Sequence, residues 1–174
     1  MSPRAACRLE TLGFTAVYDY TGGKADWLAA GLPTEGPAAS TLRAGRLART
    51  GVPICALDDT VATARDRVEA SDEDRCVVVS GAGVVLGILD AAALTGDEDA
   101  LVSDGMRDGP ATVRANEDLA GLLERMHRRS VTSILVTDPD GRLIGALHRE
   151  DADAAMSMSE QCEPEGGGGG QHGL

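Results

Sequence analysis

The sequence has few aromatic residues and no long hydrophobic run. Aromatic side chains make up 2% of the 174 residues, so the core of a chain that is 43% hydrophobic must be built from aliphatic side chains. No run approaches the roughly 18 apolar residues of a membrane span, and no basic and then apolar leader opens the chain. We therefore expect a cytoplasmic protein with no membrane partner.

Basic residues are also scarce. The chain has 16 lysines and arginines against 28 acidic residues, which gives a formal net charge of −12. Such a surface repels a phosphate backbone, so we expect no nucleic-acid partner. One small phosphate-bearing ligand stays compatible with this charge, because local arginines and helix N-termini can reverse the field inside a pocket.

The cysteines form no motif. None of the four lies in a C-x-x-C pair, so neither a disulfide framework nor a zinc site is indicated. His172 is likewise too isolated near the end of the chain for metal binding. We expect reduced thiols and no metal, with the second and third thiols at buried strand positions. The cysteines are Cys7, Cys55, Cys76 and Cys162.

The most informative feature is a repeat with a period of 58 residues. No insertion is needed between about residue 53 and residue 94. A fixed period with matching glycines and apolar positions indicates one supersecondary unit used twice. The matches include Cys76–Val79 with Ile134–Thr137, Gly83 with Gly141, Gly87 with Gly145 and Leu89 with Leu147.

The second copy reads as β-α-β-β-α. Asn116 offers a helix N-cap, and Glu117 and Asp118 then lie at the positive end of the helix dipole. Apolar residues recur at helical spacing through Met126. The expected segments are a strand over 111–113, a helix after 116, a strand over 131–137, a turn over 138–141, a strand over 143–147 and a helix from about 149.

The first copy follows the same order. Asp58 or Asp59 is expected to cap a helix that runs through Val68. Strands are expected over 76–79 and 84–89, around a turn at 80–83, with a short alanine-rich helix after them. Neither copy alone covers both faces of its small sheet, so the two should pack together. We expect an α+β (α/β) fold in which the tandem repeats form a pseudo-two-fold pair.

Over these residues the sequence resembles the CBS (cystathionine-β-synthase-type) family. The resemblance is carried by the Val102-x-Asp104-x-Met106 segment, the capped helix, the hairpin turn at 138–141 and the segment from Gly145 to Asp151. It implies a disc-like pair, or Bateman module, that regulates and does not catalyse and that often dimerises. The clefts of such pairs hold AMP, ADP, ATP or S-adenosylmethionine, so we expect one of these as a regulatory ligand and a homodimer.

The resemblance also implies a site in the second copy. The family signature Gly-h-x-Ser/Thr-x-x-Asp places its Asp, here Asp151, at the ribose hydroxyls. His148 stands at the Ser/Thr position, where it can donate to a phosphate, and Arg149 adds charge. The first copy has lost the acid, and Asp90 there would repel phosphate, so we expect an empty or structural first cleft.

The adenine is expected between the start of the second copy and the strand that follows its helix. Backbone groups there would read the base edge, and apolar side chains would cover its face. The alternative is that Asp151 only caps the last helix and that the pair is a ligand-free dimerisation scaffold. The expected ligand-binding residues are Pro110, Ala111, Thr112, Thr132, Ser133, Ile134, His148, Arg149 and Asp151.

The first residues read differently. Residues 2–13 are expected to form a helix that Gly13 ends, and 15–20 a short strand; a turn and a short helix follow before Pro33. This helix-strand-helix segment resembles the C-terminal third of a rhodanese-like sulfurtransferase domain. The catalytic cysteine loop of that family precedes the part present here. Cys7 lies inside the helix, where no cradle of free N–H groups activates it; we therefore expect no catalytic residue.

The expected organisation divides the chain into five parts. Residues 1–36 are expected to be a rhodanese-like fragment that is truncated, either in the protein itself or because the start codon was assigned too far downstream. Residues 37–50 are expected to be a linker. The CBS repeats cover 51–95 and 101–156, and the glycine-rich tail 157–174 is expected to be disordered. A helix is expected over 38–50, with Arg43, Arg46 and Arg49 on a solvated face.

Overall fold

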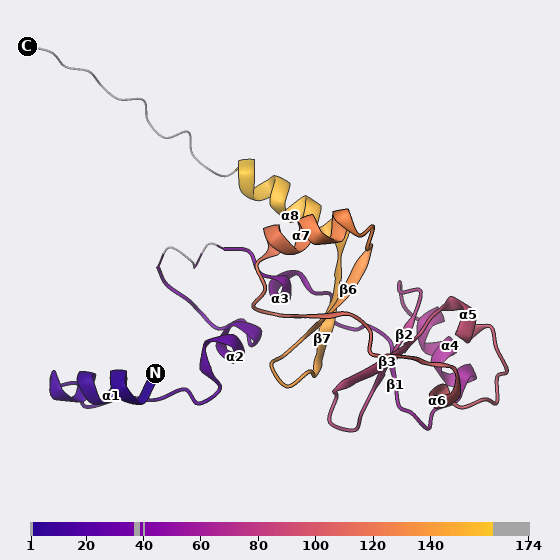
Figure 1. The fold of residues 1–174 in the computed structure, drawn as a ribbon, viewed down its shortest axis with the longest axis horizontal. Helices are drawn as coiled ribbons and strands as arrows, with labels where there is room; N and C mark the ends of the chain where they lie inside the picture. The colour runs from indigo at the N-terminus through magenta and orange to yellow at the C-terminus, as the bar shows by residue number, and fades with distance from the viewer. Residues whose placement is uncertain (1, 37–38, 40, 162–174) are drawn as a thin grey trace, which may run out of the picture.

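The structure is a computed structural model that describes residues 2–36, 39 and 41–161. Both copies of the repeat have the expected order β-α-β-β-α, and each is preceded by a four-residue helix (Figure 1). In chain order the elements are α1 (Ser2–Thr11), α2 (Gly23–Ala29), α3 (Ala44–Leu47), β1 (Ile54–Cys55), α4 (Val61–Glu69), β2 (Cys76–Val79), β3 (Val85–Leu89), α5 (Ala91–Leu94), α6 (Val102–Gly105), β4 (Arg107–Asp108), β5 (Thr112–Arg114), α7 (Leu119–Arg128), β6 (Ser133–Thr137), β7 (Leu143–His148) and α8 (Arg149–Gln161).

The strands form two small mixed sheets. The first has the order β1-β2-β3-β4 and the second the order β5-β6-β7. In each sheet the first strand pairs in parallel with the second, which pairs in antiparallel fashion with the third. The registers follow the 58-residue period, since Val77 pairs with Ile88 in one sheet and Leu135 with Ala146 in the other.

The helix caps lie one or two residues later than expected. The Thr60 hydroxyl accepts the Thr63 N–H and caps α4, and the Asp118 carboxylate accepts the Gly121 N–H and caps α7. Asp59 instead accepts from the Ala56 N–H. A run of adjacent acceptors does not reveal which side chain reaches a free N–H of the first turn, so the expected caps at Asn116 and at Asp58 or Asp59 are wrong.

The segment before each copy packs on the other copy. We call residues 42–49 and 100–107 the first and second lead-in segments. The first docks on residues 115–119 and the second on residues 57–61, so the chain crosses between the halves twice. The backbone bonds are Ala44 N to Glu117 O, Gly45 N to Ala115 O and Leu119 N to Leu42 O, matched 58 residues away by Val102 N to Asp59 O, Ser103 N to Leu57 O and Val61 N to Ala100 O.

The lead-in segments explain one pair of repeated glycines. A Cβ on Gly145 would overlap the carbonyl oxygen of Arg49, and one on Gly87 would lie 2.9 Å from the carbonyl oxygen of Arg107. Each lead-in segment crosses a third strand at a position where no side chain fits. The second pair, Gly83 and Gly141, has φ of +79° and +86° in the hairpin turns, a conformation that favours glycine.

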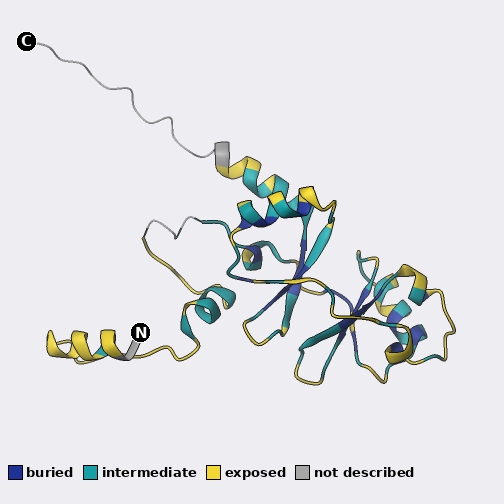
Figure 2. Cartoon of the chain, viewed as in Figure 1, coloured by how far each residue is buried: buried dark blue, intermediate teal, exposed yellow. Residues whose placement is uncertain are grey.

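Three clusters of buried aliphatic residues form the core (Figure 2). One lies inside each copy, under its helices. The third lies between the two sheets and holds the halves together, which confirms that the copies pack against each other. Its buried members are Val52, Val77, Ile88, Leu135 and Ala146.

The N-terminal segment contains no strand. Helix α1 ends at Thr11, two residues before Gly13, whose positive φ (+94°) lies in the turn after the helix. Residues 15–20 pair with no strand in the described part of the chain. Tyr18 is 90% exposed. An extended segment without a neighbour leaves its backbone groups to water, so the expected helix-strand-helix order is wrong at its centre.

The linker and the end of the chain also differ from expectation. Among the described residues of 38–50, only Ala44–Leu47 is helical. Arg43 donates to the Asn116 carbonyl at 2.9 Å and Arg49 binds carboxylates of α8, so these arginines do not form one solvated face. Helix α8 continues through Gln161, five residues into the expected tail, whose remainder lies outside the described residues. No helix of the described chain is both long and apolar enough to cross a bilayer.

Candidate functional site

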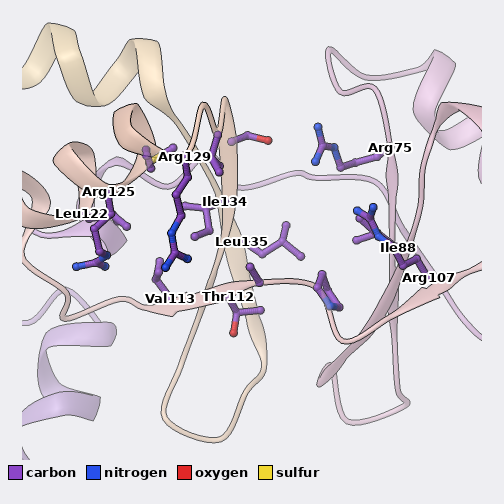
Figure 3. Close-up of a pocket in the computed structure, with 15 residues that line it drawn as sticks. Arg75, Ile88, Arg107, Thr112, Val113, Leu122, Arg125, Arg129, Ile134 and Leu135 are labelled. Atoms are coloured by element: carbon purple, nitrogen blue, oxygen red, sulfur yellow. The ribbon is translucent and has the colours of Figure 1, made fainter.

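A cleft of about 400 Å³ lies between the two repeats. The second repeat supplies β5, the start of β6 and the inner face of α7. The first sheet supplies residues of β3, of β4 at the end of the second lead-in segment, and the residue before β2 (Figure 3). The lining residues are Arg75, Ile88, Arg107, Pro110, Ala111, Thr112, Val113, Leu122, Arg125, Met126, Arg129, Val131, Ser133, Ile134 and Leu135.

Four arginines line this cleft in a chain whose net charge is −12. Arg75 comes from the first repeat and Arg107 from the second lead-in segment that pairs with its sheet, whereas Arg125 and Arg129 lie on the opposite wall (Figure 3). No carboxylate is among the residues that line the cleft. The cleft therefore carries a concentrated positive charge and suits an anion.

Two of the four arginines already have a carboxylate partner. Arg75 Nε lies 2.7 Å from Asp74 Oδ1, and Arg125 Nη2 lies 2.6 Å from Glu117 Oε1. The hydrogen bond to Asp74 is the main cause of a raised pKa at Arg75. Among the described residues, Arg107 and Arg129 have no side-chain hydrogen bond or ion pair. Their guanidinium groups are available to a ligand.

The structure divides the expected ligand-binding residues between different places. Five of the nine line the cleft: Pro110, Ala111, Thr112, Ser133 and Ile134. Thr132, His148 and Arg149 line a separate cavity of about 300 Å³ together with Glu150 and Asp153. The residues expected at the base and those expected at the phosphate thus belong to two cavities.

Asp151 lines neither cavity. Its Oδ2 lies 2.6 Å from Arg49 Nε and its Oδ1 lies 2.8 Å from Arg49 Nη2, while the same Nη2 reaches Glu150 at 3.0 Å. The hydrogen bond from Arg49 holds the pKa of Asp151 below its usual value. In this structure the carboxylate expected at a ribose is bound to the first lead-in segment.

His148 connects the two repeats. Its Nε2 lies 2.9 Å from Glu73 Oε1, and both side chains are largely buried, with 18% and 10% of their surface exposed. His148 is therefore a largely buried contact and not a surface residue. Asp90, the residue one period earlier, accepts the Ala93 N–H and caps α5.

Sequence reasoning missed the four arginines. Arg125 lies on a helix expected to pack on the core, and Arg129 follows that helix directly. The crossing of the second lead-in segment brings Arg107 to the cleft. The one usable signal is the 58-residue period, which aligns Arg107 with Arg49 and Ala93 with Asp151.

The described cysteines are free thiols: Cys7 is exposed, whereas Cys55 and Cys76 are buried on neighbouring strands. Their Sγ atoms lie 3.1 Å apart. The burial at strand positions agrees with expectation. Cys162 lies outside the described residues. Among the residues that the structure describes, no group of three His, Cys, Asp or Glu side chains is placed to hold a metal.

Comparison with known proteins gives one family and one fold. The family model of the CBS domain matches residues 99–157. No curated protein matches the sequence. Among solved structures, the chain is similar to the cystathionine β-synthase pair domain of a putative Mg²⁺ transporter from Shewanella oneidensis, with a TM-score of 0.61, 17% identity and coverage of 92% of this chain and 96% of that one.

Two similar structures contain nucleotides. The CBS-pair protein CBSX2 from Arabidopsis thaliana, in its complex with AMP, has a TM-score of 0.59, 19% identity and coverage of 68% and 98%. The cytosolic domain of the Mg²⁺ channel MgtE in complex with ATP has a TM-score of 0.59 and 22% identity. That match includes 67% of this chain and 50% of the MgtE domain, so this chain spans about half of that domain. Residues 99–157 thus match the CBS domain family, and the chain has the fold of a CBS pair.

Proposed function

We propose that this chain is a non-catalytic regulatory CBS-pair module that binds an adenosine nucleotide, AMP, ADP or ATP, in the cleft between its repeats. The observation that carries the proposal is the lining of that cleft. It combines apolar walls with four arginines, although the chain as a whole is strongly acidic.

The two parts of the lining suit the two parts of a nucleotide. Val113, Leu122 and Ile134 offer apolar surface to the faces of a base, and the backbone at Pro110–Thr112 offers polar groups to its edge. Guanidinium groups bind phosphate oxygens through charge-assisted, bidentate hydrogen bonds. S-adenosylmethionine carries a positive sulfonium, so the arginines favour a nucleotide over it.

The similar structures support this proposal. CBSX2 was solved with AMP and the MgtE cytosolic domain with ATP. A ligand that contacts both repeats would stabilise their mutual packing, which is the physical basis for a regulatory response. We further propose that the module acts in the cytoplasm as a homodimer, which size-exclusion chromatography with light scattering would test.

A thermal-shift titration tests the nucleotide. The wild-type chain and Arg129→Ala are heated with AMP, ADP, ATP or S-adenosylmethionine, and with adenosine as a ligand that lacks phosphate. At a hundred times its dissociation constant a ligand stabilises the native state by about 2.7 kcal/mol. We expect the largest shifts with the nucleotides and a reduced shift for Arg129→Ala.

The principal alternative is a ligand-free dimerisation scaffold. It predicts no shift with any of these ligands, and that result would overturn the nucleotide proposal. A rhodanese-like sulfurtransferase is the other alternative, and it predicts thiocyanate formation from cyanide that is lost in Cys7→Ser. No contact of Cys7 in the described structure favours it.

A further inference from the structure

The two lead-in segments carry equivalent arginines in different environments. Arg49 and Arg107 are separated by 58 residues, and each pairs through its backbone with the third strand of a repeat, at Ala146 and Ile88. The Arg49 side chain binds Asp151 and Glu150 at the start of α8. The matching positions at the start of α5 are Ala93 and Ala92.

This difference decides where Arg107 points. Alanine offers no acceptor, so nothing at α5 can bind the guanidinium as α8 binds that of Arg49. Arg107 instead lines the cleft (Figure 3). Within the described residues its side chain makes no hydrogen bond. The two equivalent arginines therefore differ. The charge of Arg49 is neutralised by carboxylates, whereas that of Arg107 is available to a ligand.

We infer that Arg107, which the second lead-in segment holds against β3 of the first repeat, supplies the phosphate-binding wall on that side of the cleft, and that it is available because Ala93 replaces the carboxylate that holds Arg49. The ligand class is one with a chain of phosphates. This inference rests on the proposed function only in using the same cleft, since the phosphate chain can be tested without a nucleoside.

The placement of the four arginines favours several phosphates over one. Arg107 and Arg129 are the two without a carboxylate partner, and they lie on opposite walls. A di- or triphosphate is longer and offers more oxygens than a single phosphate, so it suits arginines on two walls better. We expect affinity to rise from AMP to ADP to ATP and to fall with added salt, since the cleft is open to solvent.

The second repeat suggests the decisive substitution. Ala93→Asp gives the first repeat the carboxylate that the second has at Asp151, and it should draw Arg107 out of the cleft. Arg107→Ala removes the same guanidinium directly. Ala82→Asp adds the same charge in the exposed hairpin turn and serves as the control. Circular dichroism without ligand establishes that each variant is folded.

Isothermal titration calorimetry with inorganic tripolyphosphate and with ATP gives the readout. We expect Arg107→Ala and Ala93→Asp to weaken both ligands about tenfold, because a hydrogen bond to a charged group is lost, and Ala82→Asp to bind within about twofold of wild type. If ATP binds and neither variant differs from the control, the inference is wrong while the nucleotide proposal stands.

Two further outcomes separate the proposals. If tripolyphosphate binds through Arg107 and ATP binds no more tightly than tripolyphosphate, the inference holds and the adenosine part of the proposed function is wrong. If wild type binds neither ligand, both are wrong.

Discussion

Arg49 and Asp151 form a two-point ion pair that joins the first lead-in segment to the last helix of the second repeat, at 2.6 and 2.8 Å. These residues are 102 positions apart in sequence. The ion pair fixes the first lead-in segment to the second repeat. The equivalent arginine, Arg107, has Ala93 in place of the aspartate, so it makes no such pair and lines the cleft.

This ion pair predicts a pH-dependent contribution to stability. The pKa of Asp151 is lowered in the folded chain, so its stabilisation is present above the unfolded pKa of about 3.9 and is lost as pH falls through the folded value. Asp151→Asn should lower the free energy of unfolding at pH 7 by the small amount of an exposed pair, less than about 1 kcal/mol, with a correspondingly small drop in melting temperature. At pH 2.5 the difference between the variant and wild type should be smaller than at pH 7. A difference of equal size at both pH values would contradict this assignment.

The repeated glycine at the lead-in crossing predicts a packing defect. Gly145→Ala places a methyl group against the carbonyl oxygen of Arg49, and we expect a loss of about 2 kcal/mol in the free energy of unfolding, measured by urea denaturation. Gly81→Ala is the matched control, because no atom lies within 4 Å of the added Cβ. Equal stability of the two variants would show that the lead-in segment does not cross at Gly145.

The cluster between the sheets predicts that the repeats are stable only together. Val77→Asp buries an unpaired carboxylate in that cluster and should cost more than about 4 kcal/mol, enough to unfold the chain at 25 °C. Its register partner Ile54 is 47% exposed. Ile54→Asp should therefore keep a cooperative thermal transition in circular dichroism, which Val77→Asp should lack. A folded Val77→Asp chain would mean that the sheets do not pack as described.

The thiols predict a simple labelling pattern. In a Cys162→Ser background, a disulfide reagent such as dithionitrobenzoate should react at once with the exposed Cys7. Cys55 and Cys76 are buried and should react only after denaturation. One thiol before denaturation and three after it is the expected stoichiometry. Fast reaction of three thiols in the native chain would contradict the burial of β1 against β2.

Most of the fold could be predicted because the 58-residue repeat shows that one structural unit occurs twice. Matching apolar positions such as Val77 and Leu135 align without a gap, and the strand order follows from one copy read twice. The caps could not be predicted to the residue, since Asn116, Glu117 and Asp118 all offer oxygen atoms. The strand expected at 15–20 fails because a strand depends on a partner that local sequence does not contain.

The site was predicted in part for a physical reason. Pro110–Thr112 and Ser133–Ile134 line the cleft because they lie where two neighbouring strands of one repeat begin, a local relationship. Arg107 and Asp151 depend on which half each lead-in segment contacts. These contacts join residues 39 to 77 positions apart, so no local pattern indicates them.

The crossed lead-in segments have a consequence for any isolated half. A fragment of residues 99–157 would carry a segment whose docking surface lies on the absent half, and it would lack the segment that covers its own β7. Two such fragments could satisfy each other by exchange, turning the internal pseudo-symmetry into a true two-fold axis. The double crossing thus makes the interlocked pair, rather than the single copy, the smallest unit in which every docking surface is occupied.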